Sequence, residues 1–428
     1  MKKKFKIVFL PFKASMWDSL ESIYLAARND KDCEPCVVPI PYYEKHRDKS
    51  FGRLCYEGGD YPQNIPIADW RGYFKENRPD AIIFHNPYDN NNLITSVHPD
   101  FYTRELRKKT DLLVYVNYGI TYYEAKTPGH LGYLPSFTFS DISVTHTKEY
   151  AVQIKYLIDM NPTFIKNDVV ALGSPKFDAV LNKGRDDFTV PPEWREKIKG
   201  KKVLLFSTGI SEILRDEKAF MRSQRTVFDT FRARGDVVLW WRPHPLTKET
   251  IANICPRFLS FYNKMTKDYI EDGFGIYDET ADINRAIAWS DACYTDGSSI
   301  LYLYLATGKP FALRDTGKKL NLQTDNSNDF TALLKTRINS MKAAKGANIL
   351  KTNYIIWWHC FADADFVNKI EYNNFLDRFL HFTLNENLYP DAKEYREQKR
   401  NLLQNAVENA DGTAGQKIYD YVRFSLSV

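Results

Sequence analysis

The amino-acid sequence predicts an α/β protein with two Rossmann-like domains, each built on a doubly wound parallel sheet, that face a central cleft. Three observations support this prediction. The chain has 428 residues, which exceeds the size at which one hydrophobic core usually stops growing. Short runs of Val, Ile and Leu alternate with helix-length amphipathic segments. This alternation breaks once, near residue 184, and then begins again.

The first half of the chain contains the apolar runs expected of strands that are buried on both faces. These runs span residues 5–10, 37–40, 81–84, 112–116, 142–145 and 169–172. Between the first two runs, Leu20, Ile23, Tyr24 and Ala27 fall at helical spacing within residues 17–27. Repeated strand, helix, strand order implies right-handed crossovers and a parallel sheet.

Residues 184–194 interrupt the pattern with a charged stretch followed by two prolines, which is typical of an interdomain linker. A helix is then predicted over residues 217–234, where Phe220, Phe228 and Phe231 share one face. Strands are predicted at 202–206, 237–241, 275–277, 292–295 and 311–313. The expected domains are 1–185 and 195–390, with a helical segment over 391–428 that packs back on the first domain.

Composition and charge exclude several classes of protein. Lys plus Arg exceed Asp plus Glu by 59 − 54 = 5, too few for a nucleic-acid coat but compatible with a phosphate site or an anionic membrane surface. No run of about 18 apolar residues predicts a membrane-spanning helix. The sequence contains no Walker phosphate loop and no Gly-x-Gly-x-x-Gly, so nothing supports an NTPase or a dinucleotide oxidoreductase.

The cysteines and acidic pairs do not predict a metal site. The six cysteines indicate a reducing cytoplasm rather than a disulfide framework. Cys33 and Cys36 have the spacing of a metal or redox pair, but no second pair follows at zinc distance, and Pro35 favours a turn that enters a strand. Asp363 and Asp365 form an Asp-x-Asp that does not follow a clear strand.

Because ligands of open parallel sheets bind beyond the carboxyl ends of strands, the residues that follow each strand are candidates for a site. Arg242-Pro243-His244-Pro245 follows the run 237–241. The prolines keep the backbone extended, so Arg242 and His244 project to one side and can place a guanidinium and an imidazole on a phosphate. A stiff loop with a solvated histidine is the alternative.

A second polar cluster, Thr295-Asp296-Gly297-Ser298-Ser299, follows the run 292–295 and precedes a helix. Gly297 allows a tight turn and close approach of a ligand to the backbone. Ser298 and Ser299 add hydroxyl groups to the free amides of a helix N-terminus, where anions bind. Simple N-capping by Asp296 or Ser298 is the alternative, and the two roles are compatible.

These residues resemble the CDP-glycerol glycerophosphotransferases that make wall teichoic acids. That family has an Asp-Ile-Asn helix start, a Thr-Asp-x-Ser-Ser loop, a Lys-Pro strand, a Pro-His-Pro element and a Gly-x-Pro-Arg-Asn-Asp element. The matching residues here are Asp282-Ile283-Asn284, Ser290-Asp291, Thr295 to Ser299, Gly308-Lys309-Pro310-Phe311, Arg242 to Pro245, Gly173-Ser174-Pro175-Lys176-Phe177-Asp178 and Asp411-Gly412-Thr413-Ala414. The likeness runs, with gaps, from about residue 112 to the C-terminus.

The resemblance implies a GT-B fold, with an acceptor-side domain at 1–185 and a donor-nucleotide domain at 195–390. It implies transfer of a polyol phosphate from a CDP-linked donor to a hydroxyl of a polymer, glycan or lipid-linked acceptor, with release of CMP and no metal or other cofactor. By this resemblance His244 contacts the donor phosphates, Ser298 and Ser299 bind the pyrophosphate, and Asp296 shapes their loop. Arg242 is added on chemical grounds alone.

One departure from the family concerns the general base. The family has a Trp-His-Gly-Thr-Pro element after a strand of its first domain, whereas Asn117-Tyr118-Gly119 stands here, with Tyr118 in place of the histidine. A neutral phenol with a pKa near 10 is a poor base. His130 and Glu124, in the loop after the same strand, and His146, at the end of the next strand, are therefore the candidates for accepting the proton.

Two further functions remain open. The first keeps the GT-B fold and replaces the donor with a nucleotide-sugar, and the second is a nucleotide-binding relative without turnover. Lipid-linked acceptors would bring the protein to the inner face of the cell membrane, although no segment has a one-sided basic face. Of the 27 Tyr and 27 Phe, most are expected in the cores, and Tyr118, Tyr122 and Tyr123 are expected to line a polyol or sugar site.

Overall fold

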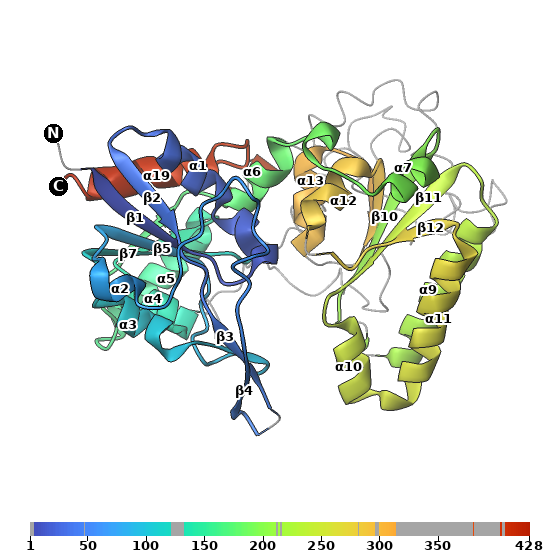
Figure 1. Cartoon of the computed structure of the whole chain (residues 1–428), viewed down its shortest axis with the longest axis horizontal. Coiled ribbons are helices and arrows are strands. Elements are labelled where there is room, and N and C mark those ends of the chain that lie inside the picture. The colour runs from blue at the N-terminus through green and yellow to red at the C-terminus, as the bar shows by residue number, and fades with distance from the viewer. Residues whose placement is uncertain are drawn as a thin grey trace, which may run out of the picture. The chain divides into compact units, whose positions relative to one another are not determined.

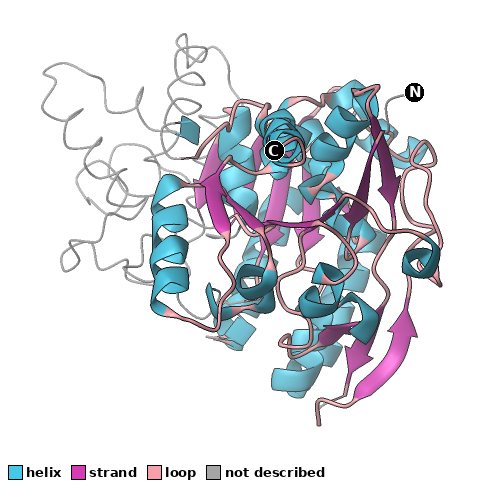
Figure 2. Cartoon of the chain, turned by 90° about the vertical axis from the view of Figure 1, so that its left-hand side faces the viewer, coloured by secondary structure: helices cyan, strands magenta, loops and turns pink. Residues whose placement is uncertain are grey.

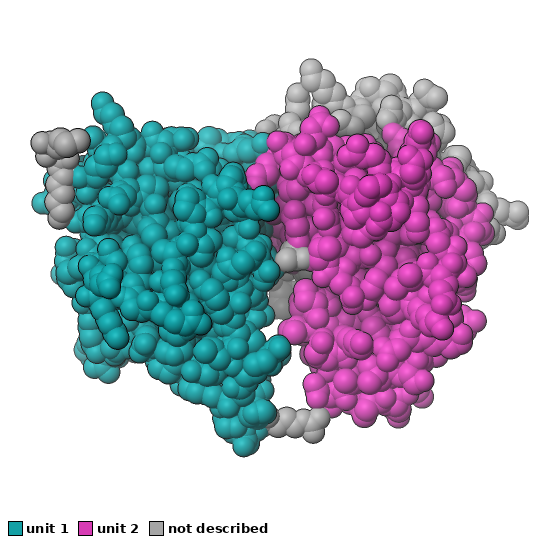
Figure 3. Space-filling model, in the orientation of Figure 1, with its two compact units in different colours: residues 1–182, 403–428 teal, residues 183–402 magenta. Residues whose placement is uncertain are grey.

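A computed structural model describes residues 4–46, 48–120, 132–210, 213–214, 216–280, 282–295, 299–313, 380, 403–404 and 407–428. The chain divides into two compact units, coloured separately in Figure 3. Unit 1 consists of residues 1–182 and 403–428, and unit 2 consists of residues 183–402. Among the described residues, no helix is both long and apolar enough to cross a membrane.

Unit 1 is built on a six-stranded parallel sheet with the order β2-β1-β5-β7-β8-β9 (Figure 1). The strands are β1 (Phe5–Leu10), β2 (Cys33–Val37), β5 (Ala81–Phe84), β7 (Leu112–Val116), β8 (Ile142–Thr145) and β9 (Asp168–Ala171). The helices around it include α1 (Glu21–Asn29), α3 (Thr103–Arg107), α4 (Pro135–Phe139), α5 (Lys148–Met160), α6 (Pro175–Leu181) and α19 (Ala414–Ser425). Shorter helices are η1 (Ala14–Ser19), α2 (Tyr73–Glu76) and η2 (Pro99–Phe101).

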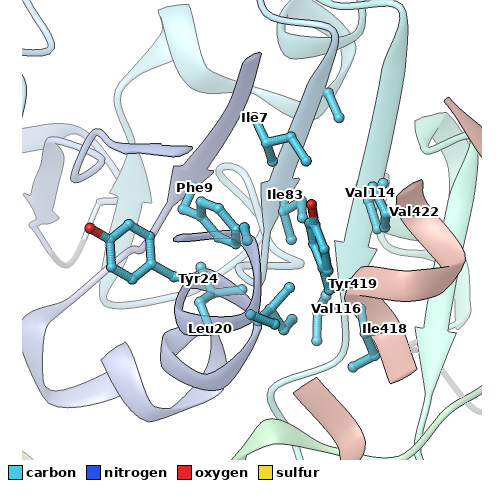
Figure 4. Packing of buried hydrophobic residues seen from close by; sticks show 14 of the residues in the cluster. Ile7, Phe9, Leu20, Tyr24, Ile83, Val114, Val116, Ile418, Tyr419 and Val422 are labelled. Atoms are coloured by element: carbon cyan, nitrogen blue, oxygen red, sulfur yellow. The ribbon is translucent and has the colours of Figure 1, made fainter. Parts of the chain in front are cut away.

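Helices cover both faces of this sheet (Figure 2), as a doubly wound fold requires. Side chains of a strand alternate between its two faces. Ile7 and Phe9 of β1 therefore pack in one buried cluster with α1 and α19, as Figure 4 shows, whereas Val8 and Leu10 pack in a second cluster with α3, α4 and α5. The fold class predicted from the apolar runs is confirmed.

The second strand differs from its predicted position. The prediction placed it at 37–40 and placed Cys33 in a preceding turn, but β2 begins at Cys33. Since Cys33 and Cys36 are three residues apart in a strand, their side chains point to opposite faces: Cys33 lies in the cluster with α1, and Cys36 packs against the other cluster. The two thiols therefore cannot converge on one metal ion.

A small antiparallel sheet with the order β4-β3-β6 projects from unit 1 (Figure 1). Its strands are β3 (Tyr42–Lys45), β4 (Phe51–Cys55) and β6 (Thr95–Val97). Phe51 and Leu54 are 45% and 43% exposed on β4, and Leu93 and Ile94, just before β6, are 73% and 52% exposed. The sheet thus presents an apolar patch to solvent.

Helix α19 joins unit 1 through the element that includes Gly173 and Asp178. The Asp178 carboxylate accepts the N–H groups of Ala414 and Gly415 at the start of α19, at 3.1 and 2.7 Å. Gly173 has a φ of +89°, and a Cβ added there would lie 2.1 Å from the carbonyl oxygen of Glu408. These contacts hold the last segment of the chain beside the start of α6.

This close approach makes Gly173→Ala strongly destabilising. Gly72→Ala is a matched control in the same unit, since Gly72 has a φ of +76° and open space around its Cα. Both variants place alanine in the left-handed region, but only Gly173→Ala adds a backbone clash. We expect it to lower the free energy of unfolding by about 1–3 kcal/mol more than the control, measured by urea denaturation. Equal losses would contradict the packing described.

Unit 2 contains a five-stranded parallel sheet with the order β12-β11-β10-β13-β14. The strands are β10 (Lys202–Thr208), β11 (Val237–Pro243), β12 (Gly275–Tyr277), β13 (Ala292–Thr295) and β14 (Phe311–Leu313). The helices include α7 (Pro192–Ile198), α9 (Glu217–Arg232), α10 (Thr247–Ile254), α11 (Leu259–Asp272), α12 (Ile283–Trp289) and α13 (Ser299–Thr307), with the short η4 (Arg185–Asp187) and η5 (Pro256–Phe258).

The predicted apolar face of α9 is confirmed, because Phe220, Phe228 and Phe231 are buried in one cluster with β10, β11 and α11. The segment 184–194, predicted as an interdomain linker, follows the boundary between the two units at residue 182 and packs on unit 2. Arg185 forms an ion pair with Asp291 at 2.9 Å, and the Trp194 and Trp240 rings meet edge to face at 5.1 Å. Two bulky residues outside any periodic pattern thus anchor this segment on unit 2.

Candidate functional site

The strand order of unit 2 identifies the edge of the sheet at which a ligand is expected. The chain passes from β10 to β11 and β12 on one side, then returns to place β13 and β14 on the other side of β10. The order therefore reverses between β10 and β13, and open α/β sheets bind ligands beyond the carboxyl ends of the strands at such a point. Thr295, the first residue of the predicted Thr-Asp-Gly-Ser-Ser cluster, ends β13 at this reversal.

The register brings the two predicted polar clusters of unit 2 to one edge. Ser207 of β10 pairs with Arg242 of β11 on one side and with Thr295 of β13 on the other. One residue further, Thr208 pairs with Pro243, which precedes His244. The ends of these three strands therefore lie side by side, with Arg242, Ser207 and Thr295 in one row across the sheet.

Only part of the second cluster belongs to the described residues. Asp296, Gly297 and Ser298 lie outside them. Ser299 begins α13 and is exposed. The first N–H groups of a helix have no partner within the helix, so α13 directs backbone donors to the same edge as His244.

His244 is partly exposed, and the turn after β11 sets its orientation. The Leu246 N–H donates to Nδ1 of His244 at 3.1 Å, and the Thr247 N–H donates to the His244 carbonyl oxygen at 2.8 Å. Because Nδ1 accepts this hydrogen bond, the neutral imidazole carries its proton on Nε2. His244 thus presents a donor of the kind that binds a phosphoryl oxygen.

Arg242 has a different environment from the one predicted for a phosphate ligand. Its side chain is 8% exposed and forms an ion pair at 2.9 Å with Asp278, which is fully buried. The guanidinium also donates to the Thr280 carbonyl oxygen, and burial lowers the pKa of Arg242. In this structure the guanidinium is held by the segment after β12. This environment favours a role for Arg242 in positioning the end of β11 over direct binding of a phosphate.

Asp278 is a residue that the sequence analysis missed. Its carboxylate accepts the Trp240 indole N–H at 3.0 Å and the Thr280 N–H at 2.9 Å, and it also faces Arg285 at 3.5 Å. Asp278 directly follows β12, and a polar residue after a predicted strand was the signal that could have found it. The carboxylate links the ends of β11 and β12 to the start of α12.

Several motifs that carried the family resemblance hold the scaffold together. Asp282 accepts the N–H groups of Asn284 and Arg285 and caps α12. Lys309 Nζ donates to the carbonyl oxygens of Ile287, Ala288 and Ser290 at 2.7, 3.0 and 2.8 Å, at the other end of α12. Together with Asp178 at the start of α19, these residues account for much of the resemblance, and the contacts described here are all within the fold.

In unit 1, the residues predicted for the acceptor side form a tight turn after β7. The Asn117 side-chain oxygen accepts the Gly119 N–H at 3.1 Å. The Tyr118 hydroxyl donates to the Tyr88 hydroxyl at 3.4 Å, and burial raises the pKa of Tyr118 above its ordinary value. A phenol that stays neutral at higher pH is a weaker candidate for a general base, as expected.

The three predicted alternatives for the base have different outcomes. His130 and Glu124 lie outside the described residues. His146 was expected to point into a cleft, but its side chain is only 1% exposed and packs against the Tyr150 ring at 6.1 Å. Its carbonyl oxygen accepts the Glu408 N–H at 3.0 Å, so the C-terminal segment covers this strand end. The burial excludes direct contact between His146 and a substrate in this conformation.

His85 is the second residue that the sequence analysis missed. It directly follows β5, which was correctly predicted, and its ring lies 6.0 Å from the Tyr118 ring. Its side chain is fully buried, and its Nε2 accepts the Phe12 N–H at 3.0 Å. His85 could have been identified from the sequence, because it is a polar residue directly after a predicted strand.

No protein-family model matches the sequence, and no curated protein matches it either. Solved structures resemble the fold. A putative UDP-N-acetylglucosamine 2-epimerase from Listeria monocytogenes matches with a TM-score of 0.52 at 14% identity, covering 99% of this chain and 97% of that chain. A second UDP-N-acetylglucosamine 2-epimerase gives a TM-score of 0.50 at 13% identity, again covering 99% and 97%.

A structure of the wall teichoic acid polymerase TagF also matches, with a TM-score of 0.50 at 14% identity, covering 99% of this chain and 89% of that chain. Identities this low establish the fold alone. The two Rossmann-like parallel sheets and these whole-chain likenesses show that the chain has the GT-B fold.

Proposed function

We propose that this protein transfers glycerol phosphate, or a related polyol phosphate, from a CDP-activated donor to a hydroxyl of a cell-surface polymer or glycan, with release of CMP. One observation carries this proposal: the oriented His244 and the N-terminus of α13 follow β11 and β13, the two strands that flank β10, at the edge where the sheet order of unit 2 reverses. We propose a CDP-linked donor because the residues of these two loops resemble motifs of the CDP-glycerol glycerophosphotransferases.

In the proposed reaction, the donor phosphates lie against unit 2. His244 donates from Nε2 to a phosphoryl oxygen, and Ser298, Ser299 and the first amides of α13 bind the pyrophosphate. Gly297 permits close approach of the backbone, and Asp296 shapes the loop. Preorganised donors of this kind stabilise the negative charge that develops during phosphoryl transfer. Arg242 acts indirectly, by holding the end of β11 through Asp278.

The acceptor hydroxyl oxygen attacks the phosphorus nearest the polyol and forms a new P–O bond. The P–O bond to CMP breaks, and CMP leaves with the bonding electron pair. The hydroxyl proton passes to a base of the acceptor side. His130 and Glu124, in the loop after β7, are the proposed candidates, since His146 is buried.

A nucleotide-sugar donor is the second candidate, and the likeness to two UDP-N-acetylglucosamine 2-epimerases favours it. A thermal-shift panel of CDP-glycerol, CDP-ribitol and UDP-N-acetylglucosamine separates the two, because a ligand of the folded state raises its stability. We expect a CDP-alditol to give the largest shift and to yield CMP once an acceptor is added. A shift with UDP-N-acetylglucosamine alone overturns the proposal, and binding of a CDP-alditol without CMP release indicates a relative without turnover.

We further propose that the protein works in the cytoplasm, at the inner face of the membrane, where a lipid-linked acceptor is found. The apolar patch of the small sheet is the proposed contact with anionic lipid. Lys45 and Arg53 belong to the same strands as this patch, and Lys49 lies in the turn between them. Arg53 forms an ion pair with Glu44 of β3 at 2.7 Å, and Asp48 lies beside Lys49, so the proposed contact rests mainly on the exposed apolar side chains.

Substitution of Phe51 and Leu54 by serine tests this contact. We expect the double variant to lose roughly tenfold in affinity for phosphatidylglycerol vesicles in a sedimentation assay, because two apolar side chains no longer enter the lipid. A double variant with Val152→Ser and Phe424→Ser, which are 66% and 67% exposed on α5 and α19, should bind like the parent. Equal losses in both double variants would exclude a specific role for the patch.

A further inference from the structure

The outer face of α5 carries apolar side chains that the core of unit 1 does not bury. The inner face of this helix consists of Tyr150, Ala151, Ile154, Leu157 and Ile158. Val152, Tyr156 and Met160 follow one another at intervals of four residues, so they form one line along the opposite face. We call these three residues the α5 stripe. They are 66%, 66% and 62% exposed, and three aligned apolar side chains indicate a contact surface where a single one would not.

Two charges of opposite sign flank the α5 stripe. With about 3.6 residues per turn, Lys155 and Asp159 fall on the same side of the stripe. Both are exposed, and neither forms an ion pair within the part of the chain that the structure describes. Lys155 precedes Asp159 by four residues, which is the less favourable order for an ion pair inside one helix. The two charges are therefore available to a partner that lies on the stripe.

A second copy of α5 in antiparallel orientation matches both the stripe and its charges. A two-fold axis beside Tyr156 places Tyr156 against itself and Val152 against Met160 of the second copy. The same rotation keeps the charged flanks of the two helices on one side and reverses their direction. Lys155 of each copy then lies within about 3 Å, along the helix axis, of Asp159 of the other copy. The charge pattern is therefore complementary to itself.

A parallel pair of helices lacks this complementarity, because each residue of the line then faces its own copy. Lys148 lies four residues before Val152 on the same line, and its side chain is 73% exposed although it pairs with Glu408 at 3.0 Å. A parallel pair would bring two Lys148 ammonium groups together. Lys155 would face the opposite flank, where Glu149 lies six residues away (155 − 149), or roughly 9 Å along the axis.

We propose that a second copy of this chain docks on the α5 stripe, so that two chains form an antiparallel, two-fold symmetric helix pair centred on Tyr156. This inference goes beyond the proposed function and does not depend on the donor. One helix pair buries less than the roughly 1,600 Å² of a standard interface, so we expect a dissociation constant on the order of 10 μM. A vesicle sedimentation assay at submicromolar protein then measures the monomer.

Sedimentation velocity of the full chain over about 1–100 μM tests dimer formation. We expect the parent to change from monomer to dimer in this range. Tyr156→Glu brings two carboxylates together at the axis and should weaken the dimer at least about tenfold. Phe424→Glu, at a side chain 67% exposed on α19, is the matched control and should dimerise as the parent does.

A parent that stays monomeric at every concentration overturns the proposal, and so does equal weakening in both variants. If the parent stays monomeric and Tyr156→Glu reduces its binding to phosphatidylglycerol vesicles, the α5 stripe contacts lipid and the proposal is wrong.

Two charge reversals test the pairing across the axis. Lys155→Glu and Asp159→Lys each bring like charges together in the two-fold pair, so each variant alone should dimerise about fivefold more weakly than the parent. An equimolar mixture of the two variants should recover the dimer, because the introduced charge of each variant then faces an opposite charge on the other. A mixture that dimerises no better than its components overturns the antiparallel pairing.

Cysteine substitutions along the α5 stripe test the orientation. Under mild oxidation, Tyr156→Cys should form a disulfide with its own copy, because the axis passes beside this position. Val152→Cys should cross-link efficiently only when it is mixed with Met160→Cys. The parent, which retains its own cysteines, measures the background. Self-cross-linking at all three positions indicates a parallel pair, and cross-linking no greater than the background excludes the contact, so either result overturns the proposal.

Discussion

Replacement of His244 by alanine should reduce the rate of CMP release from CDP-glycerol by about 10²–10³-fold, the loss typical of removing one donor to a developing oxyanion. The Nε2–H of His244 is held in place by the hydrogen bond that Nδ1 accepts from Leu246. Its removal takes a preorganised donor away from the phosphates. The measurement is kcat by a coupled CMP assay, with the thermal shift by CDP-glycerol recorded in parallel.

Two conservative variants separate the functions of the two ring nitrogens. His244→Asn can still accept the Leu246 N–H near the position of Nδ1 but lacks the distal donor. His244→Gln carries an amide N–H close to the position of Nε2. We therefore expect the glutamine variant to retain more activity than either the asparagine or the alanine variant. Full activity in His244→Ala, or the reverse order of the two amides, would remove His244 from the proposed mechanism.

Asp278→Ala should have the largest effect on stability. Asp278 is fully buried, and its removal leaves the Arg242 guanidinium buried without its anion. Breaking a buried pair in this way costs about 3–5 kcal/mol. We expect the unfolding of unit 2 to shift to lower urea concentration by a corresponding amount, measured by circular dichroism and tryptophan fluorescence.

Asp229→Ala is a matched control, because Asp229 forms an exposed ion pair with Arg232 in the same unit. Exposed pairs contribute at most about 1 kcal/mol, so this variant should unfold nearly as the parent does. The double variant Arg242→Met/Asp278→Leu should recover part of the lost stability, since it removes the charge that Asp278→Ala leaves behind. A loss in Asp278→Ala no larger than in Asp229→Ala would contradict the role of this pair.

The candidate site of unit 2 shows how far local sequence identifies function. His244 and the Thr295 to Ser299 cluster could be selected because each follows an apolar run that is long enough to be a buried strand. Arg242 was selected on the same ground, yet its guanidinium binds Asp278, which lies 36 residues later in the chain (278 − 242). Local spacing does not reveal such a partner, because the contact depends on the pairing of β11 with β12.

His146 illustrates the same limit in unit 1. Its place at the end of β8 suggested exposure at a strand end, but a segment more than 250 residues further along the chain covers it, as the Glu408 to His146 hydrogen bond shows (408 − 146 = 262). His85 is the converse case. Its position after a strand was visible in the sequence, but its hydrogen bond with Phe12 depends on β1 and β5 being neighbours.

The local pattern of apolar residues was sufficient to predict two Rossmann-like parallel-sheet domains, most strand positions and the apolar face of α9, because burial on both sides of a sheet requires continuous apolar runs. The GT-B class was implied by the family resemblance. The strand order, the reversals between β1 and β5 and between β10 and β13, and the partners of Arg242, His146 and His85 came only from the folded chain. These features depend on contacts between residues far apart in sequence. The spacing of apolar residues predicts which face of a helix or strand is buried. It does not identify the element that packs against that face.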